Sequence, residues 1–165
     1  FIPKDDKRKE RLPSPNNVIK QIQKERRDLN DEPRWLIALI SDTGIRLSET
    51  CGLLKSDICL DDELPHINLV VHQWRRQKTG SSSRQIPLVG TSLWAAKQVV
   101  KQSHQFAFPK YCNETKCNAN SASAALNKWL KSRVPSGCVI HSFRHSLRDR
   151  LRAVECPADI IDAIG

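Results

Sequence analysis

The sequence predicts a mainly α-helical domain with one small antiparallel β-sheet, an α+β fold. Apolar residues recur at helical spacing along most of the chain. Between Cys59 and Leu88 the pattern changes to β-branched and apolar runs separated by a turn rich in glycine and serine. With 165 residues, 39% of them hydrophobic, and no internal repeat, the chain is long enough for one globular domain.

Three helices are predicted in the first third of the chain. Residues 14–30 begin with a Ser-Pro pair, which suits an N-cap followed by the first helical position. Residues 32–44 form a second, more buried helix, and Gly44 stands where a left-handed C-terminal residue is needed. Residues 46–58 predict a short third helix that leads into extended chain.

A β-hairpin and further helices follow. The runs HINLVVHQW (66–74) and RQIPLVG (84–90) predict two strands, and RRQKTGSSS (75–83) between them is turn material. The remaining chain predicts a helix at 91–105, a polar loop at 106–121, and helices at 121–133, 141–154 and 158–165.

The charge balance favours a polyanionic partner. Lys plus Arg number 27 against 18 Asp plus Glu, a net charge of +9, which fits either nucleic-acid binding or a solvated basic surface. The longest apolar run, WLIALI, is far shorter than the roughly 18 residues of a membrane helix. We therefore expect a cytoplasmic protein with no membrane partner. The six cysteines show no CxxC spacing, which predicts free thiols.

Two basic elements could carry chemistry in the first half of the chain. In DTGIRLSET, Arg46 follows a glycine-terminated helix, and Glu49 lies three residues further on, where it can orient the arginine. Lys78 lies at the tip of the predicted hairpin and is flanked by Arg75, Arg76 and Arg84. Taken alone, each element also fits an ordinary solvated surface.

A third basic element begins the helix predicted at 141–154. His141 and Arg144 are three residues apart, so both project from one face and can donate to a pair of phosphate oxygens. Arg148 extends the basic character of this helix. An amphipathic helix with a charged outer face would explain the arginines but not His141.

A zinc site on this helix is the alternative to a phosphate-binding site. His141 and His145 have the spacing of an HExxH zinc helix, but Ser142 stands where that motif has its catalytic glutamate. Cys112 and Cys117 could supply half of a zinc site, but no second Cys/His pair follows at suitable spacing. The sequence therefore predicts no metal site.

The three basic elements together resemble the catalytic domain of the tyrosine recombinase, or phage integrase, family. The resemblance rests on TGIRLSE (43–49), QKTGSSSRQIPL (77–88) and HSFRH (141–145), which occur in the family's order. It implies the tyrosine recombinase catalytic-domain fold. It also implies a site-specific DNA recombinase that cleaves and rejoins strands through a 3′-phosphotyrosyl intermediate.

The resemblance also implies a role for each matched residue. Arg46 and Arg144 would hold the scissile phosphate, with His141 bonding the same phosphate or assisting proton transfer. Lys78 would protonate the departing 5′-oxygen, and Glu49 would hold the basic cluster together against its own repulsion. No cofactor or metal is implied. Further expected members are His145 beside these groups, and Arg75, Arg76, Arg84 and Arg148 as DNA contacts.

The position of the only tyrosine departs from the family pattern. In the family the nucleophilic tyrosine follows the segment that matches His141, whereas Tyr111 precedes it. We therefore expect residues 14–165 to be a catalytic domain without its C-terminal segment and nucleophile, inactive by itself. Residues 1–13, basic and proline-containing, would end a linker from an N-terminal DNA-binding domain.

The expected partners are double-stranded DNA at a recombination site and other recombinase protomers, forming a tetramer on DNA although the free chain is a monomer. The gene would be bacterial or phage-encoded. Two alternatives remain open. One is a DNA-binding module of the same fold without catalytic duty, and the other is a type IB topoisomerase.

Overall fold

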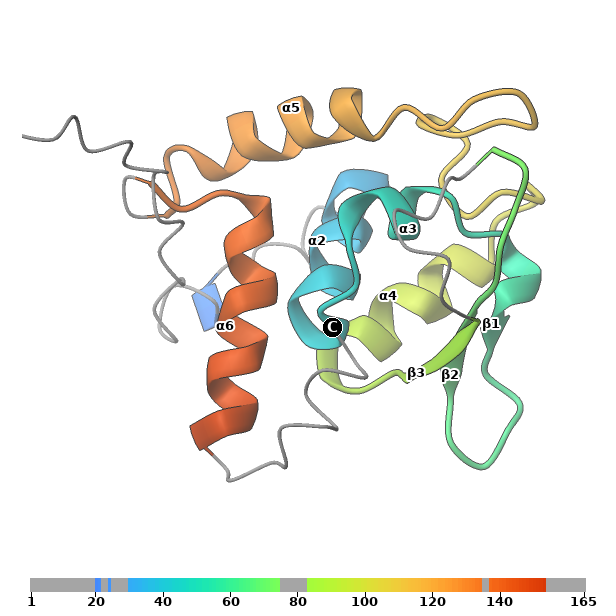
Figure 1. Cartoon of the computed structure of the whole chain (residues 1–165), viewed down its shortest axis with the longest axis horizontal. Coiled ribbons are helices and arrows are strands. Elements are labelled where there is room, and N and C mark those ends of the chain that lie inside the picture. Colours follow the sequence, from blue (N-terminus) through green and yellow to red (C-terminus); the bar gives the residue numbers. More distant parts are fainter. Residues whose placement is uncertain (1–19, 22–23, 25–29, 75–82, 135–136, 154–165) are drawn as a thin grey trace, which may run out of the picture.

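The computed structural model describes residues 20–21, 24, 30–74, 83–134 and 137–153. The predicted α+β fold is confirmed, because a three-stranded antiparallel sheet lies at one side of a group of helices (Figure 1). The hairpin tip at 75–82, the helix predicted at 158–165 and most of the helix predicted at 14–30 lie outside the described residues. The named elements are α2 (Glu32–Thr43), α3 (Leu47–Cys51), the 3-10 helix η1 (Lys55–Asp57), β1 (Ile58–Cys59), β2 (His66–Leu69), β3 (Arg84–Pro87), α4 (Gly90–Val100), α5 (Ala119–Leu130) and α6 (Ile140–Ala153).

Helix α2 is the centre of the core. Asp31 caps its N-terminus by accepting a hydrogen bond from the backbone N–H of Arg34 at 3.2 Å, and residues 35–40 are all buried. Helices α3, α4, α5 and α6 all pack against it (Figure 1). The C-terminal end of α2 is therefore held in place, and the position of the loop that follows it is fixed as a result. No helix within the described ranges is long and apolar enough to span a membrane.

The sheet has the order β1-β2-β3 with antiparallel pairing throughout. This confirms the predicted pairing of two strands and adds β1 as a third, but β2 and β3 end at Leu69 and Pro87, so both are shorter than predicted. The register pairs Leu69 with Arg84, which places Arg84 at the end of the pairing nearest the hairpin tip. The predicted third helix is shorter than expected, because α3 ends at Cys51 and the separate turn η1 precedes β1.

The segment predicted as a polar loop contributes to the core. Phe106, Ala107 and Phe108 are buried, and the backbone N–H of Ala107 donates to the carbonyl of Leu53 at 3.0 Å. Tyr111 is also buried. The segment is a loop, as predicted, since no helix or strand is named among the described residues between α4 and α5. Only its description as polar was wrong, because an apolar run this short shows no measurable period.

Helix α6 approaches the end of α2 at a glycine. Gly44 has φ +70°, the left-handed conformation predicted for it, and its N–H donates to the carbonyl of Ile40 at 2.9 Å. A Cβ at this position would lie 2.7 Å from Cδ2 of Leu147 on α6. Gly44 therefore satisfies two requirements, the backbone turn and the close approach of α6.

A carboxylate joins three helices beside this contact. Asp42 Oδ2 accepts hydrogen bonds from the backbone N–H of Thr91 at 2.8 Å and from its hydroxyl at 2.6 Å, at the start of α4. Asp42 Oδ1 lies 3.4 Å from Nη1 of Arg150 on α6, and Nη2 of Arg150 donates to the carbonyl of Ser41. These bonds fix α6 against α2 and α4.

Replacing Gly44 with alanine is expected to destabilise the fold. The left-handed backbone costs about 1–3 kcal/mol for a residue with a side chain, and the Leu147 side chain must also shift, which adds a smaller packing cost because the contact is with its terminal methyl group. Urea unfolding followed by circular dichroism measures the loss. Gly137→Ala is the matched control, since Gly137 also has a positive φ, +91°, but nothing lies within 4 Å of its added Cβ. Equal losses in the two variants would show that the contact with α6 does not contribute.

Candidate functional site

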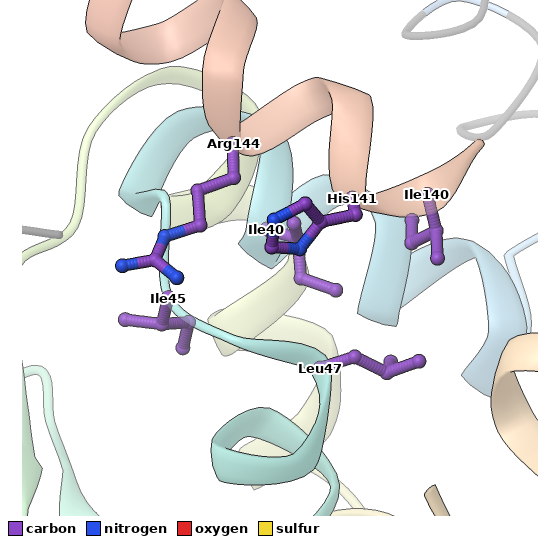
Figure 2. A pocket seen from close by; sticks show the side chains of 6 residues that line it. All are labelled: Ile40, Ile45, Leu47, Ile140, His141 and Arg144. Atoms are coloured by element: carbon purple, nitrogen blue, oxygen red, sulfur yellow. The ribbon is translucent and has the colours of Figure 1, made fainter. Parts of the chain in front are cut away.

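A small pocket lies where the first turn of α6 faces the loop after α2. Figure 2 shows the side chains of His141 and Arg144 pointing from α6 toward Ile45, in the loop after α2, and Leu47, the first residue of α3. The pocket has an empty volume of about 210 Å³, and its lining residues are Ile40, Ile45, Leu47, Ile140, His141 and Arg144. The structure therefore places two sequence-predicted site residues together above an otherwise apolar lining.

The first turn of α6 is held by its neighbours. The side-chain oxygen of Asn127, on α5, accepts a hydrogen bond from the backbone N–H of Ile140 at 2.8 Å. The hydroxyl of Ser142 accepts one from the backbone N–H of Val139 at 3.0 Å. Two of the N–H groups that a helix leaves unpaired at its start are satisfied in this way. His141 lies between Ile140 and Ser142, which both take part in these bonds, so its backbone position is fixed.

Glu49 is the acidic group of the site. Its side chain is buried and accepts a bidentate pair from Arg84, with Nη1 at 3.2 Å and Nη2 at 3.0 Å. The same carboxylate accepts the backbone N–H of Arg46 at 3.1 Å, at the start of α3. Glu49 thus fixes the backbone at Arg46, as the sequence suggested, and in addition pairs with an arginine 35 residues away.

Arg144 lies in a strongly cationic environment. Arg144 is only 8% exposed. Burial is the largest cause that lowers the pKa of its guanidinium, followed by the charge of Arg46, while Glu49 opposes the shift. Arg148 and Arg84 lower this pKa further. Among the described residues, three other arginines therefore act on the guanidinium of Arg144, and Glu49 is the one acidic group that opposes them.

Arg144 Nε has no hydrogen-bond partner among the described residues, and it is buried. A buried donor without a partner is costly, and buried charges in proteins are normally paired. The excess of positive charge around Arg144 favours an anion in the pocket. A phosphate group offers the paired oxygens that guanidinium groups bind best.

His145 lies beside the pocket rather than in its lining. It is exposed, and its ring centroid is 5.0 Å from that of His141. Ser142, which stands where a zinc helix would carry its glutamate, is buried. Within the described ranges, no group of three or more His, Cys, Asp or Glu side chains is arranged to hold a metal ion.

The described chain on both sides of residues 75–82, the segment that contains Lys78, contacts α3 and the glycine that ends it. Trp74, where the described chain stops before the tip, donates from Nε1 to the carbonyl of Gly52 at 3.0 Å. Arg84, on the returning strand, pairs with Glu49. Trp74 and Arg84 therefore both contact α3 or the glycine that ends it. The predicted site residues Lys78, Arg75 and Arg76 lie outside the described residues.

A second, mostly buried contact between a histidine and a carboxylate lies next to Trp74. His72 Nε2 lies 2.7 Å from Oδ2 of Asp57, and the His72 ring stacks on Trp74 with centroids 4.7 Å apart. The carboxylate of Asp57 also accepts the backbone N–H of Leu54 at 2.9 Å. Sequence reasoning missed these positioning residues, because His72 and Trp74 fit a simple strand pattern and Asp57 is distant in sequence.

Tyr111 lies away from the pocket. It is 4% exposed, belongs to the hydrophobic core, and has a pKa raised by burial and by interaction with Cys51, Glu32 and Asp31. The last two mark the N-terminal end of α2, whereas the pocket lies at its C-terminal end, roughly 16 Å along a twelve-residue helix. This placement agrees with the expectation that Tyr111 is not a nucleophile.

Comparison with known proteins identifies the family. Residues 15–165 match the model of the phage integrase family, so the chain belongs to this family. No curated protein sequence matches the chain significantly.

Solved structures show the fold. The Tn1549 transposon integrase, in complex with transposon right end DNA, superposes with a TM-score of 0.68 at 20% identity over 97% of this chain. XerA recombinase gives 0.72 at 13% identity over 93%, and XerH recombinase, bound to its palindromic difH substrate, gives 0.66 at 15% over 93%. The tyrosine recombinase catalytic-domain fold is thereby confirmed. This chain spans 59%, 55% and 46% of those three chains respectively.

The Glu49–Arg84 pair is expected to be strongly coupled. A double-mutant cycle with Glu49→Gln and Arg84→Gln should give a coupling energy of about 1–3 kcal/mol, because the pair is bidentate and mostly buried. Urea unfolding of the four proteins measures it. The matched control is the more exposed pair Arg34–Asp31, for which we expect less than about 1 kcal/mol. Equal coupling in the two cycles would contradict a special role for Glu49.

Proposed function

We propose that this protein is the catalytic region of a site-specific DNA recombinase of the tyrosine type. One observation carries the proposal: the buried, incompletely paired guanidinium of Arg144 lies beside His141 and within electrostatic reach of Arg46, at the edge of a small pocket. Membership of the phage integrase family supports it.

The proposed reaction is a transesterification at a DNA phosphate. Arg46 and Arg144 bind the non-bridging oxygens and stabilise the negative charge that grows on them in the pentavalent transition state. His141 donates a hydrogen bond to the same phosphate or assists proton transfer to and from the nucleophile. Glu49 keeps the arginines together, and His145 supports His141 from the neighbouring turn.

The covalent step requires a nucleophile and a leaving-group acid. A tyrosine hydroxyl attacks phosphorus, the bond to the 5′-oxygen breaks, and Lys78 supplies the proton to that oxygen. A 5′-hydroxyl from another strand later attacks the 3′-phosphotyrosyl link and releases the tyrosine. We propose that the nucleophile is a tyrosine outside these 165 residues, since Tyr111 is buried in the core.

Double-stranded DNA is the proposed partner. The net charge of +9 and the arginine cluster support it, and the solved relatives from Tn1549 and XerH are DNA complexes. Arg75, Arg76 and Arg148 are proposed DNA contacts, and Arg84 combines such a role with its bond to Glu49. We propose a tetrameric synapse on DNA, a linker at 1–13 from a separate DNA-binding domain, and a bacterial or phage origin.

A covalent-trapping assay tests the proposal. The full-length protein from the parent gene, incubated with a nicked suicide substrate, should give a covalent protein–DNA band. Arg144→Ala should reduce the rate of its formation about 10²–10³-fold, because a preorganised donor to the developing charge is lost. Arg144→Lys should fall in between, since it keeps the charge but not the bidentate fork.

Arg133→Ala is the control, because it removes one guanidinium that lies over the Trp129 ring on α5 rather than at the pocket. It should leave the band unchanged. DNA binding without any covalent band in the wild-type protein would favour the non-catalytic binding module. Relaxation of one duplex without exchange between two sites would favour a topoisomerase.

A further inference from the structure

Two cysteines face each other in a short hairpin between α4 and α5. The backbone N–H of Asn118 donates to the carbonyl of Tyr111 at 2.7 Å, and that of Asn113 donates to the carbonyl of Lys116 at 3.0 Å. Between these bonds, Cys112 and Cys117 form an isolated antiparallel bridge. Because the flanking residues make the hydrogen bonds, the two cysteines are a non-hydrogen-bonded pair.

This pairing suits a disulfide. Residues in a non-hydrogen-bonded antiparallel pair have Cα atoms about 4.5 Å apart and side chains on the same face. Disulfides require a Cα separation of about 4.4–6.8 Å. The turn is fixed by Asn113, whose side-chain oxygen accepts the N–H groups of Thr115 at 2.9 Å and Lys116 at 2.8 Å. The backbone therefore holds the two thiols in a register from which an S–S bond can form.

A third thiol lies close to this pair but is less able to react. Cys51, at the end of α3, is fully buried. Burial raises its pKa well above the usual value, and Cys117 and Cys112 raise it further, which places all three thiols near one another. Cys117 is half-buried and Cys112 is buried. Thiolates are the nucleophiles in disulfide exchange, so Cys117 is the entry point and Cys51 remains a thiol.

We propose that Cys112 and Cys117 form a reversible dithiol–disulfide site that accepts a low-molecular-weight disulfide, such as oxidised glutathione, as oxidant. The Cys117 thiolate attacks one sulfur of oxidised glutathione, which forms a mixed disulfide and releases one glutathione thiolate. The Cys112 thiolate then attacks the sulfur of Cys117 and releases the second glutathione. The two cysteines lose two protons and two electrons, and oxidised glutathione is reduced to two molecules of glutathione.

The position of the pair connects it to α5. Asn118 directly follows Cys117, and its side chain caps α5 by accepting the N–H of Ser121 at 3.1 Å. A disulfide would fix the entry to α5 and restrict the unfolded chain, so oxidation is expected to raise the melting temperature. The proposal does not depend on DNA chemistry.

Peptide mapping tests the proposal directly. The 165-residue protein is equilibrated with oxidised glutathione, free thiols are blocked by alkylation, and the protein is digested with trypsin without reduction. Cleavage after Lys110 and Lys116 places the two cysteines in different peptides unless a disulfide joins them. We expect the joined peptides, lighter by two hydrogens than their sum, to become the main species, and reduction to separate them.

Three variants sharpen the result. Cys117→Ser should abolish the joined peptides and the redox dependence of the melting temperature. Cys51→Ser should keep both, and so should Cys138→Ser, which replaces a buried cysteine in the connection between α5 and α6. Persistent glutathione on Cys117 without the internal link would overturn the proposal. A dominant link between Cys51 and Cys117 would overturn it as well.

Discussion

The carboxylate of Glu49 is the interaction on which the site depends. Arg46, Arg148 and Arg84 all lower the pKa of Arg144 by charge repulsion. One buried carboxylate that accepts a bidentate pair offsets about one such repulsion. The negative charge of Glu49 opposes the repulsion that the other arginines exert on Arg144. The site keeps an excess of positive charge, which a phosphate can neutralise.

The second constraint is the docking of α6 onto the end of α2. Arg46 and Arg144 are almost one hundred residues apart in sequence, so only tertiary packing brings them together. Gly44 allows this by leaving room for Leu147, and Asp42 holds α6 through Arg150. Both residues belong to the same short segment as Arg46. The backbone that presents the first arginine thus also positions the helix that presents the second.

The sequence predicted the local features well and the long-range ones poorly. The turn at Gly44 and the shared face of His141 and Arg144 follow from spacing within one helix, so they were visible without a structure. The Glu49–Arg84 bond joins α3 to β3, and no local pattern marks it. The burial of Phe106 and Phe108 was also hidden, because a short apolar run between polar residues has no measurable period.

The Glu49–Arg84 bond also connects the pocket to the hairpin. Arg84 is the first residue of β3 and pairs with Leu69, the last residue of β2. The counter-ion of the arginine cluster therefore binds the end of the β2–β3 pair. Movement of this strand away from α3 would break a mostly buried ion pair and leave Glu49 without Arg84, which is costly in a poorly hydrated environment. The Glu49–Arg84 ion pair therefore also restrains the start of β3 against α3.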